Sequence, residues 1–81
     1  MKTVRAKFLC THVANNGSET SPSFAVYMGA VYSDDPNSEN KKFTKATPNA
    51  TFNMVITVPE TAAFFEPGQE YYLDLTKAPK A

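Results

Sequence analysis

"FAVYMGAVY", residues 24–32, is apolar on both sides of an extended strand. Alternate residues from Phe24 to Tyr32 form one apolar side, and those from Ala25 to Val31 form the other. Such a strand needs cover on both sides, which predicts a central position in a sheet or in a closing barrel. Gly29 is expected to mark a bend or bulge where the sheet curls.

Three further segments show the alternation that is typical of half-buried strands, at residues 2–13, 50–58 and 70–76. In the first, basic Arg5 and Lys7 occupy the side opposite the apolar residues. The predicted inward residues are Val4, Ala6, Phe8, Cys10, Ala50, Phe52, Met54, Ile56, Val58, Tyr71, Leu73 and Leu75.

Polar segments at residues 14–23 and 33–42 predict loops, and "ETAAFFE" at 60–66 predicts one or two helical turns. Pro67-Gly68 fits the centre of a type II turn, and residues 77–81 form a short basic tail. A further short strand at "KKFTKA", 41–46, is left open. We therefore expect a single all-β domain, mainly β with one short helix, whose small antiparallel sheet of four to five strands curls into a barrel or sandwich.

The chain has 81 residues, one cysteine, one histidine and a net charge of zero. A domain of this size buries only about 60% of its unfolded surface, so its stability is marginal. A lone Cys10 forms no intrachain disulfide, and a single Cys with a single His cannot complete a four-ligand zinc site. We expect no cofactor or metal, and we expect association with another protein or another copy to supply the missing stability.

Catalytic chemistry has little support in the residues. Cys10 and His12 lie two apart on a predicted strand, hence on the same face, but no nucleophile motif surrounds them and core packing of Cys10 is the favoured interpretation. The acidic turn containing Asp34, Asp35 and Glu39 lacks the glycine and the spacing of a calcium loop. The sequence therefore predicts a protein that is not an enzyme, with no catalytic residue.

The stretch Lys41-Lys42-Phe43-Thr44-Lys45 permits two interpretations. Lysines often protect an exposed strand edge from pairing with other chains, and this is the interpretation we favour. The alternative is single-stranded nucleic-acid binding, which combines basic residues with aromatic stacking platforms. Its residues would be Lys41, Lys42, Phe43, Lys45, Arg5 and Lys7.

The aromatic residues are too numerous for the interior of so small a sheet. Phe24, Tyr27, Tyr32, Phe43, Phe64, Phe65, Tyr71 and Tyr72 cannot all be enclosed by four short strands. Some should form an exposed apolar patch, which usually marks a contact surface. The predicted protein-contact patch is Tyr27, Phe43 and Tyr72.

The start of the chain, "MKTVRAKFLCTHVANN", has neither a long apolar run nor a small-residue cleavage site, so we expect no signal peptide. No apolar run approaches the roughly 20 residues that span a bilayer. The expected partners are a protein, a second copy or, as the alternative, nucleic acid, with no membrane.

Two segments, "AVYSDDPNSENKKFTKATPNATFNMVI" and "FFEPGQEYYLDL", carry a resemblance. A polar turn leads to a Phe-Thr-Lys-Ala-Thr-Pro phrase, and the chain finishes with a Pro-Gly turn and a Tyr-rich strand. The chain from Ala30 to Leu75 thereby resembles a group of small bacteriophage-encoded accessory proteins. The resemblance implies a phage origin, action in the host cytoplasm or the virion, and no enzymatic activity, and it transfers no site residues.

Overall fold

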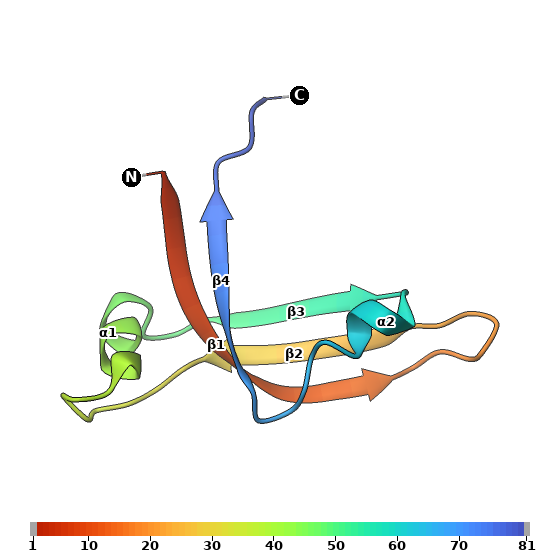
Figure 1. Ribbon diagram of the computed structural model, residues 1–81, viewed down its shortest axis with the longest axis horizontal. Helices are drawn as coiled ribbons and strands as arrows, with labels where there is room; N and C mark the ends of the chain where they lie inside the picture. The colour runs from red at the N-terminus through yellow and green to blue at the C-terminus, as the bar shows by residue number, and fades with distance from the viewer. Residues whose placement is uncertain (1, 81) are drawn as a thin grey trace.

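The computed structural model describes residues 2–80 and contains four strands and two short helices. The elements are β1 (Thr3–Asn15), β2 (Phe24–Ala30), α1 (Glu39–Ala46), β3 (Thr51–Ile56), α2 (Pro59–Ala62) and β4 (Glu70–Thr76). All neighbouring strands are antiparallel, in the order β3-β2-β1-β4. The predicted class is confirmed, since the chain is mainly β and forms one curled antiparallel sheet (Figure 1). The segment at 24–32 is central as expected, because β2 lies between β1 and β3.

The curl of the sheet comes from the long strand β1. Its second half pairs with β2 and its first half pairs with β4, while only Phe8 and Leu9 have partners in both. The ends of β1 and β4 consequently leave the rest of the sheet as a two-stranded arm (Figure 1). The sheet is thus a half-barrel with one open side.

A bulge interrupts β1 between Cys10 and His12. Cys10 pairs with Met28 and is buried, whereas His12 pairs with the exposed Tyr27. Tyr27 and Met28 are consecutive in β2 and therefore point to opposite faces of the sheet. Their partners His12 and Cys10 do so too, and the expectation that Cys10 and His12 share a face is wrong. The expected bulge at Gly29 is likewise displaced, since the irregularity lies in β1 rather than in β2.

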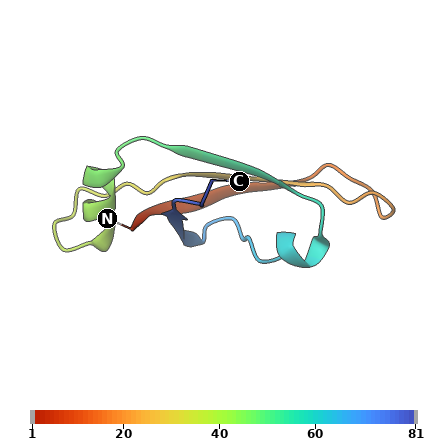
Figure 2. The same cartoon turned by 90° about the horizontal axis from the view of Figure 1, so that it is seen from above.

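The core lies on one face of the sheet, here called the inner face. Its buried residues include Phe8, Cys10, Val26 and Ile56, and Ala62 of α2 packs against them. Figure 2 shows α2 on one side of the sheet and α1 at the opposite end. Of the predicted inward residues, Val58 is misplaced, because it follows the end of β3 and is 49% exposed. The others lie on the inner face, but Val4 and Leu75 are 51% and 56% exposed there. Their exposure follows from their position on the two-stranded arm, beyond the reach of α2.

Helix α1 is a feature that the sequence prediction got wrong. Residues 33–42 were expected to be a loop and Lys41–Lys45 the edge of a sheet, but both overlap the helix Glu39–Ala46. Ser38 caps its start by accepting a hydrogen bond from Asn40 N, and Glu39 and Lys45 carry favourable charges in the first and last turns. Capping and charge therefore stabilise this short helix. It contains too few apolar residues to show a helical periodicity in the sequence.

The turns agree better with expectation. Gly68 has a φ of 91°, as the third position of a type II turn after Pro67 requires. The loop between β1 and β2 covers residues 16–23, within the predicted 14–23. Residues 77–80 of the predicted tail lie outside any helix or strand, and Ala81 lies outside the described residues.

The molecule is thin, with extents of 47 × 36 × 18 Å. Its radius of gyration is 14.9 Å, against about 11.7 Å for a compact domain of this length. Neither helix in residues 2–80 has the length and apolar character needed to cross a bilayer.

Candidate functional site

The inner face carries an open apolar groove of about 390 Å³. Side chains from all four strands and from the segment after α2 line it, including Phe8, Met28, Phe52, Met54, Phe65 and Leu73. None of the lining residues, within the part of the chain that the structure describes, carries a charge. The groove is therefore suited to an apolar occupant rather than to an ionic one.

Three aromatic rings form one wall of the groove. The centroids of Phe64, Phe65 and Tyr71 lie between 5.1 and 5.4 Å from one another. The Tyr71 hydroxyl donates to Phe64 O at 2.8 Å and accepts from Glu66 N at 2.9 Å, which fixes the segment after α2 against β4. Phe64 nevertheless remains 65% exposed. The wall is preformed, and its outermost ring faces solvent.

The apolar surface continues from the groove onto the arm. Val4 pairs with Leu75 and Ala6 pairs with Leu73, so all four side chains lie on the inner face. Since Leu73 also lines the groove, the groove and the arm form one continuous apolar strip.

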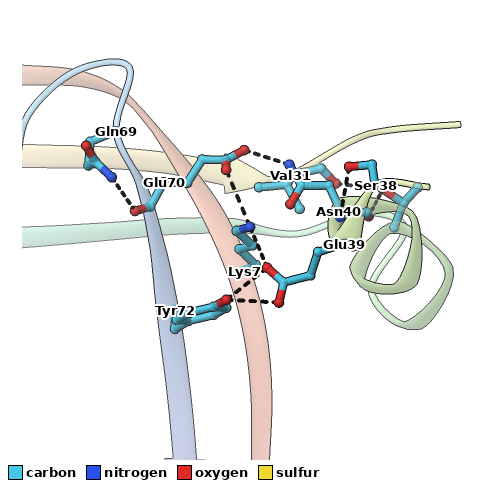
Figure 3. A network of polar contacts seen from close by, with 9 residues as sticks. Lys7, Val31, Ser38, Glu39, Asn40, Gln69, Glu70 and Tyr72 are labelled. Atoms are coloured by element: carbon cyan, nitrogen blue, oxygen red, sulfur yellow. Dashed lines mark hydrogen bonds and ion pairs between the residues drawn. The ribbon is translucent and has the colours of Figure 1, made fainter. Parts of the chain in front are cut away.

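The outer face carries a polar network that holds α1 against β1 and β4 (Figure 3). Glu39 accepts from Lys7 Nζ at 2.8 Å and from the Tyr72 hydroxyl at 2.8 Å. Lys7 Nζ also lies 3.4 Å from Glu70 Oε1, and Asn40 Nδ2 donates to the other oxygen of that carboxylate at 2.7 Å. Lys7 is thereby shared between two carboxylates.

This network shifts the titration of its members. Hydrogen bonds from Lys7 and Tyr72 lower the pKa of Glu39 below its ordinary value. The hydrogen bond to Glu39 raises the pKa of both Lys7 and Tyr72. Next to the network, a bidentate pair with Arg5 at 2.7 and 3.0 Å lowers the pKa of Asp74. The shifts of Glu39 and Lys7 favour their ionised pair, and the shift of Tyr72 favours the neutral hydroxyl that donates to Glu39, so these contacts hold α1 against β1 and β4. The shift of Asp74 favours its ion pair with Arg5, which joins β4 to β1.

The predicted contact patch is split in the structure. Phe43 and Tyr72 lie together, with ring centroids 5.9 Å apart, where α1 meets β4. Tyr27 instead packs beside His12, further along β1, at 5.7 Å. Phe43 is only half-buried, while Tyr27 and Tyr72 are exposed. The expectation that some aromatic residues stay exposed is met. All three lie on the side of the outer face, but Tyr27 pairs with His12 whereas Tyr72 pairs with Lys7, five residues earlier in β1.

The residues of the nucleic-acid alternative are also separated. Phe43 faces Lys7 and Tyr72, and with 100° between successive helical residues Lys41 and Lys45 lie on the opposite side of α1. Lys41, Lys42 and Lys45 are exposed. Arg5 and Lys7, in contrast, are paired with carboxylates. A basic groove with an aromatic floor is therefore not assembled by these six residues.

The described residues offer no cluster for a metal ion. Within residues 2–80, no group of three or more His, Cys, Asp or Glu side chains converges on a metal position. Asp35 accepts from Asn37 N within its own turn, and Glu39 is turned toward Lys7. Cys10 is buried on the inner face, opposite the face of His12.

The sequence prediction missed Phe64, Val4 and Leu75 as candidate contact residues. Val4 and Leu75 were assigned to the core because strand alternation identifies a face but not how far the covering elements extend. The structure shows the reason for their exposure: β2 is much shorter than β1 and pairs only with its second half, so the first half of β1 has β4 as its one neighbour.

Comparison of this chain with protein-family models, with curated proteins and with solved structures gave no match.

Proposed function

We propose that this chain is a non-enzymatic protein that acts through protein–protein contact, with the groove of the inner face as its contact site. The observation that carries the proposal is the continuous apolar strip from Phe64 through the groove to Leu75, with both ends more than half exposed. Contiguous exposed apolar surface on a folded protein is a common feature of protein-interaction sites. The absence of charge along the groove fits the apolar centre of an interface.

The setting of this contact follows from the resemblance to phage-encoded proteins. Such a protein would serve as a structural or decoration component of a virion, or as an inhibitor of a host protein. Both roles need a stable docking surface rather than a reaction site. The aromatic wall formed by Phe64, Phe65 and Tyr71 supports that use, because a preformed surface loses little conformational freedom on binding.

Site-specific photocrosslinking tests the proposal. A benzophenone amino acid is placed at Phe64, at the rim of the groove, and separately at Val55, which is 68% exposed on the outer face of β3. In bacterial cells that produce the chain, the Phe64 position should crosslink to protein and the Val55 position should not. Equal crosslinking at both positions, or none at Phe64, would refute the groove as the contact site.

The predicted patch is compared in the same experiment by placing the crosslinker at Tyr27. Tyr27 lies on the outer face beside His12, away from the groove. Crosslinking from Tyr27 without crosslinking from Phe64 would move the contact site to the outer face.

A further inference from the structure

The chain exposes far more surface than a folded monomer of its mass. Its accessible surface is 6218 Å² for 8.9 kDa, whereas a compact monomer of that mass exposes about 4,800 Å². The excess is about 1,400 Å². Part of it lies on the loop at 16–23 and on residues 77–80. Exposed apolar side chains lie on both faces: Val4, Phe64 and Leu75 belong to the strip on the inner face, whereas Leu9, Tyr27, Val55 and Tyr72 lie on the outer face.

The excess matches a missing layer of structure. Domains are normally built from two packed layers around a core, and here a single sheet only 18 Å thick is covered on its inner face by the four-residue helix α2. A standard protein interface removes about 800 Å² from each partner. The excess surface of the whole chain is larger than this share, and the strip on the inner face is the part of it that forms one continuous apolar surface.

We infer that the second layer is another copy of this chain, so that two inner faces pack together in a symmetric dimer. This inference rests on the proposed contact function and specifies its partner. A two-fold dimer requires a surface that complements itself, and an uncharged apolar strip meets that requirement with no opposing charges to match. The net charge of zero also leaves no overall repulsion between copies.

The dimer would bury the parts of the strip that α2 leaves open. Val4 and Leu75 on the arm and Phe64 at the rim are the exposed apolar side chains of that strip. Two-stranded ribbons are marginally stable alone in water, so the arm of one copy gains most from contact with the groove of the other. The two half-barrels then enclose a shared core.

Sedimentation equilibrium at micromolar concentrations tests the inference. The wild-type chain should show twice its mass of 8.9 kDa. Leu75→Glu should weaken the dimer at least about tenfold, because an unpaired carboxylate would be buried in an apolar interface. The matched control is Val55→Glu, a charge on an exposed aliphatic residue of the outer face, and it should change the dissociation constant about twofold or less.

A second measurement does not depend on any variant. The methyl groups of Met28 and Met54 line the groove, so their NMR signals should shift as the wild-type chain is diluted through the dimer–monomer transition. A wild-type monomer at all concentrations overturns the inference, as does a dimer that Val55→Glu dissociates and Leu75→Glu does not. Concentration-independent Met28 and Met54 signals in a chain that does dimerise would also overturn it.

The inference and the proposed function fail in different ways. A monomeric chain whose Phe64 position still crosslinks to another protein overturns the dimer and retains the contact site. A monomer whose Met28 and Met54 signals shift with an added apolar small molecule, with no crosslink to protein, overturns both and identifies the groove as a ligand site.

Discussion

The Tyr72 hydroxyl in β4 donates a hydrogen bond to the Glu39 carboxylate in α1 over 2.8 Å, between residues 33 positions apart. Lys7 of β1 donates to the same carboxylate oxygen. One side chain thus connects the helix to both strands of the arm. The Glu39 carboxylate is therefore one of the contacts that hold α1, together with the hydrogen bonds of Asn40 to Glu70 and of Thr44 to Val31 O.

Acid should weaken the folded chain through Glu39. Its pKa is lowered in the folded state from an ordinary 4.5, so its ionised form stabilises the fold above that pH. That stability is lost as the pH falls through the lowered folded pKa. We expect the urea midpoint, followed by circular dichroism, to decrease over this acid range, and Glu39→Gln to show a smaller decrease.

The control for this measurement is Glu19→Gln, at an exposed carboxylate in the loop at 16–23. It should retain the acid dependence of the wild type. Some dependence should also persist in Glu39→Gln, since the pKa of Asp74 is lowered by Arg5. An acid dependence that is identical in Glu39→Gln and wild type would show that the Glu39 network does not stabilise the fold.

Two glycines should respond in opposite ways to alanine. A methyl group at Gly17 would collide with Ser23 N and would lie 2.5 Å from Ser21 O, both of which are backbone atoms. At Gly29 no atom lies within 4 Å of the added methyl group. We expect Gly17→Ala to cost about 2 kcal/mol or more of unfolding free energy, and Gly29→Ala to be neutral or to stabilise by about 0.5 kcal/mol. Thermal unfolding of the two variants measures both, and equal effects would contradict this account of the loop.

Sequence periodicity was sufficient for the strands but not for α1. Alternation of apolar residues identified β1, β3 and β4 and their inward faces, because side-chain direction repeats every two residues. The segment that is apolar on both sides identified β2 and its central place. Helix α1 has a single large apolar residue, Phe43, and is fixed by Ser38 and by the contact of Glu39 with Lys7 and Tyr72. That contact joins distant parts of the chain, so local patterns do not contain it.

The candidate site was predictable in kind rather than in place. The surplus of aromatic residues correctly indicated exposed rings, yet it gave no means to choose among them. Which apolar side chains are exposed depends on two structural features. The bulge after Cys10 changes the face on which His12 lies, and α2 contacts β2 and β3 but does not extend to the two-stranded arm. Neither feature has a local sequence signature here.

Nucleic-acid binding should be absent or very weak. Arg5 and Lys7 are engaged by carboxylates, and the net charge is zero. We expect no gel shift of a single-stranded oligonucleotide even at low salt. A gel shift that weakens as salt rises would favour the alternative. In that case, replacing Lys41, Lys42 and Lys45 by Gln should reduce the magnitude of the slope of log K against log salt concentration by about 2.

Cys10 should report the opening of the core. It is the only cysteine, it is fully buried, and it belongs to the same core cluster as Ile56. Its thiol should react with an aromatic disulfide reagent at least about a thousandfold more slowly in the native chain than in the urea-unfolded chain. Ile56→Val removes one buried methyl group and should accelerate native labelling about two- to twelvefold.

The control for Ile56→Val is Val55→Ala, at the adjacent exposed position, which should alter the rate about twofold or less. Because Cys10 lies on the inner face, formation of the inferred dimer should also slow its labelling as the chain concentration rises. Native labelling as fast as in urea would mean that the inner face is not packed as the structure has it, and the groove would then lose its preformed wall.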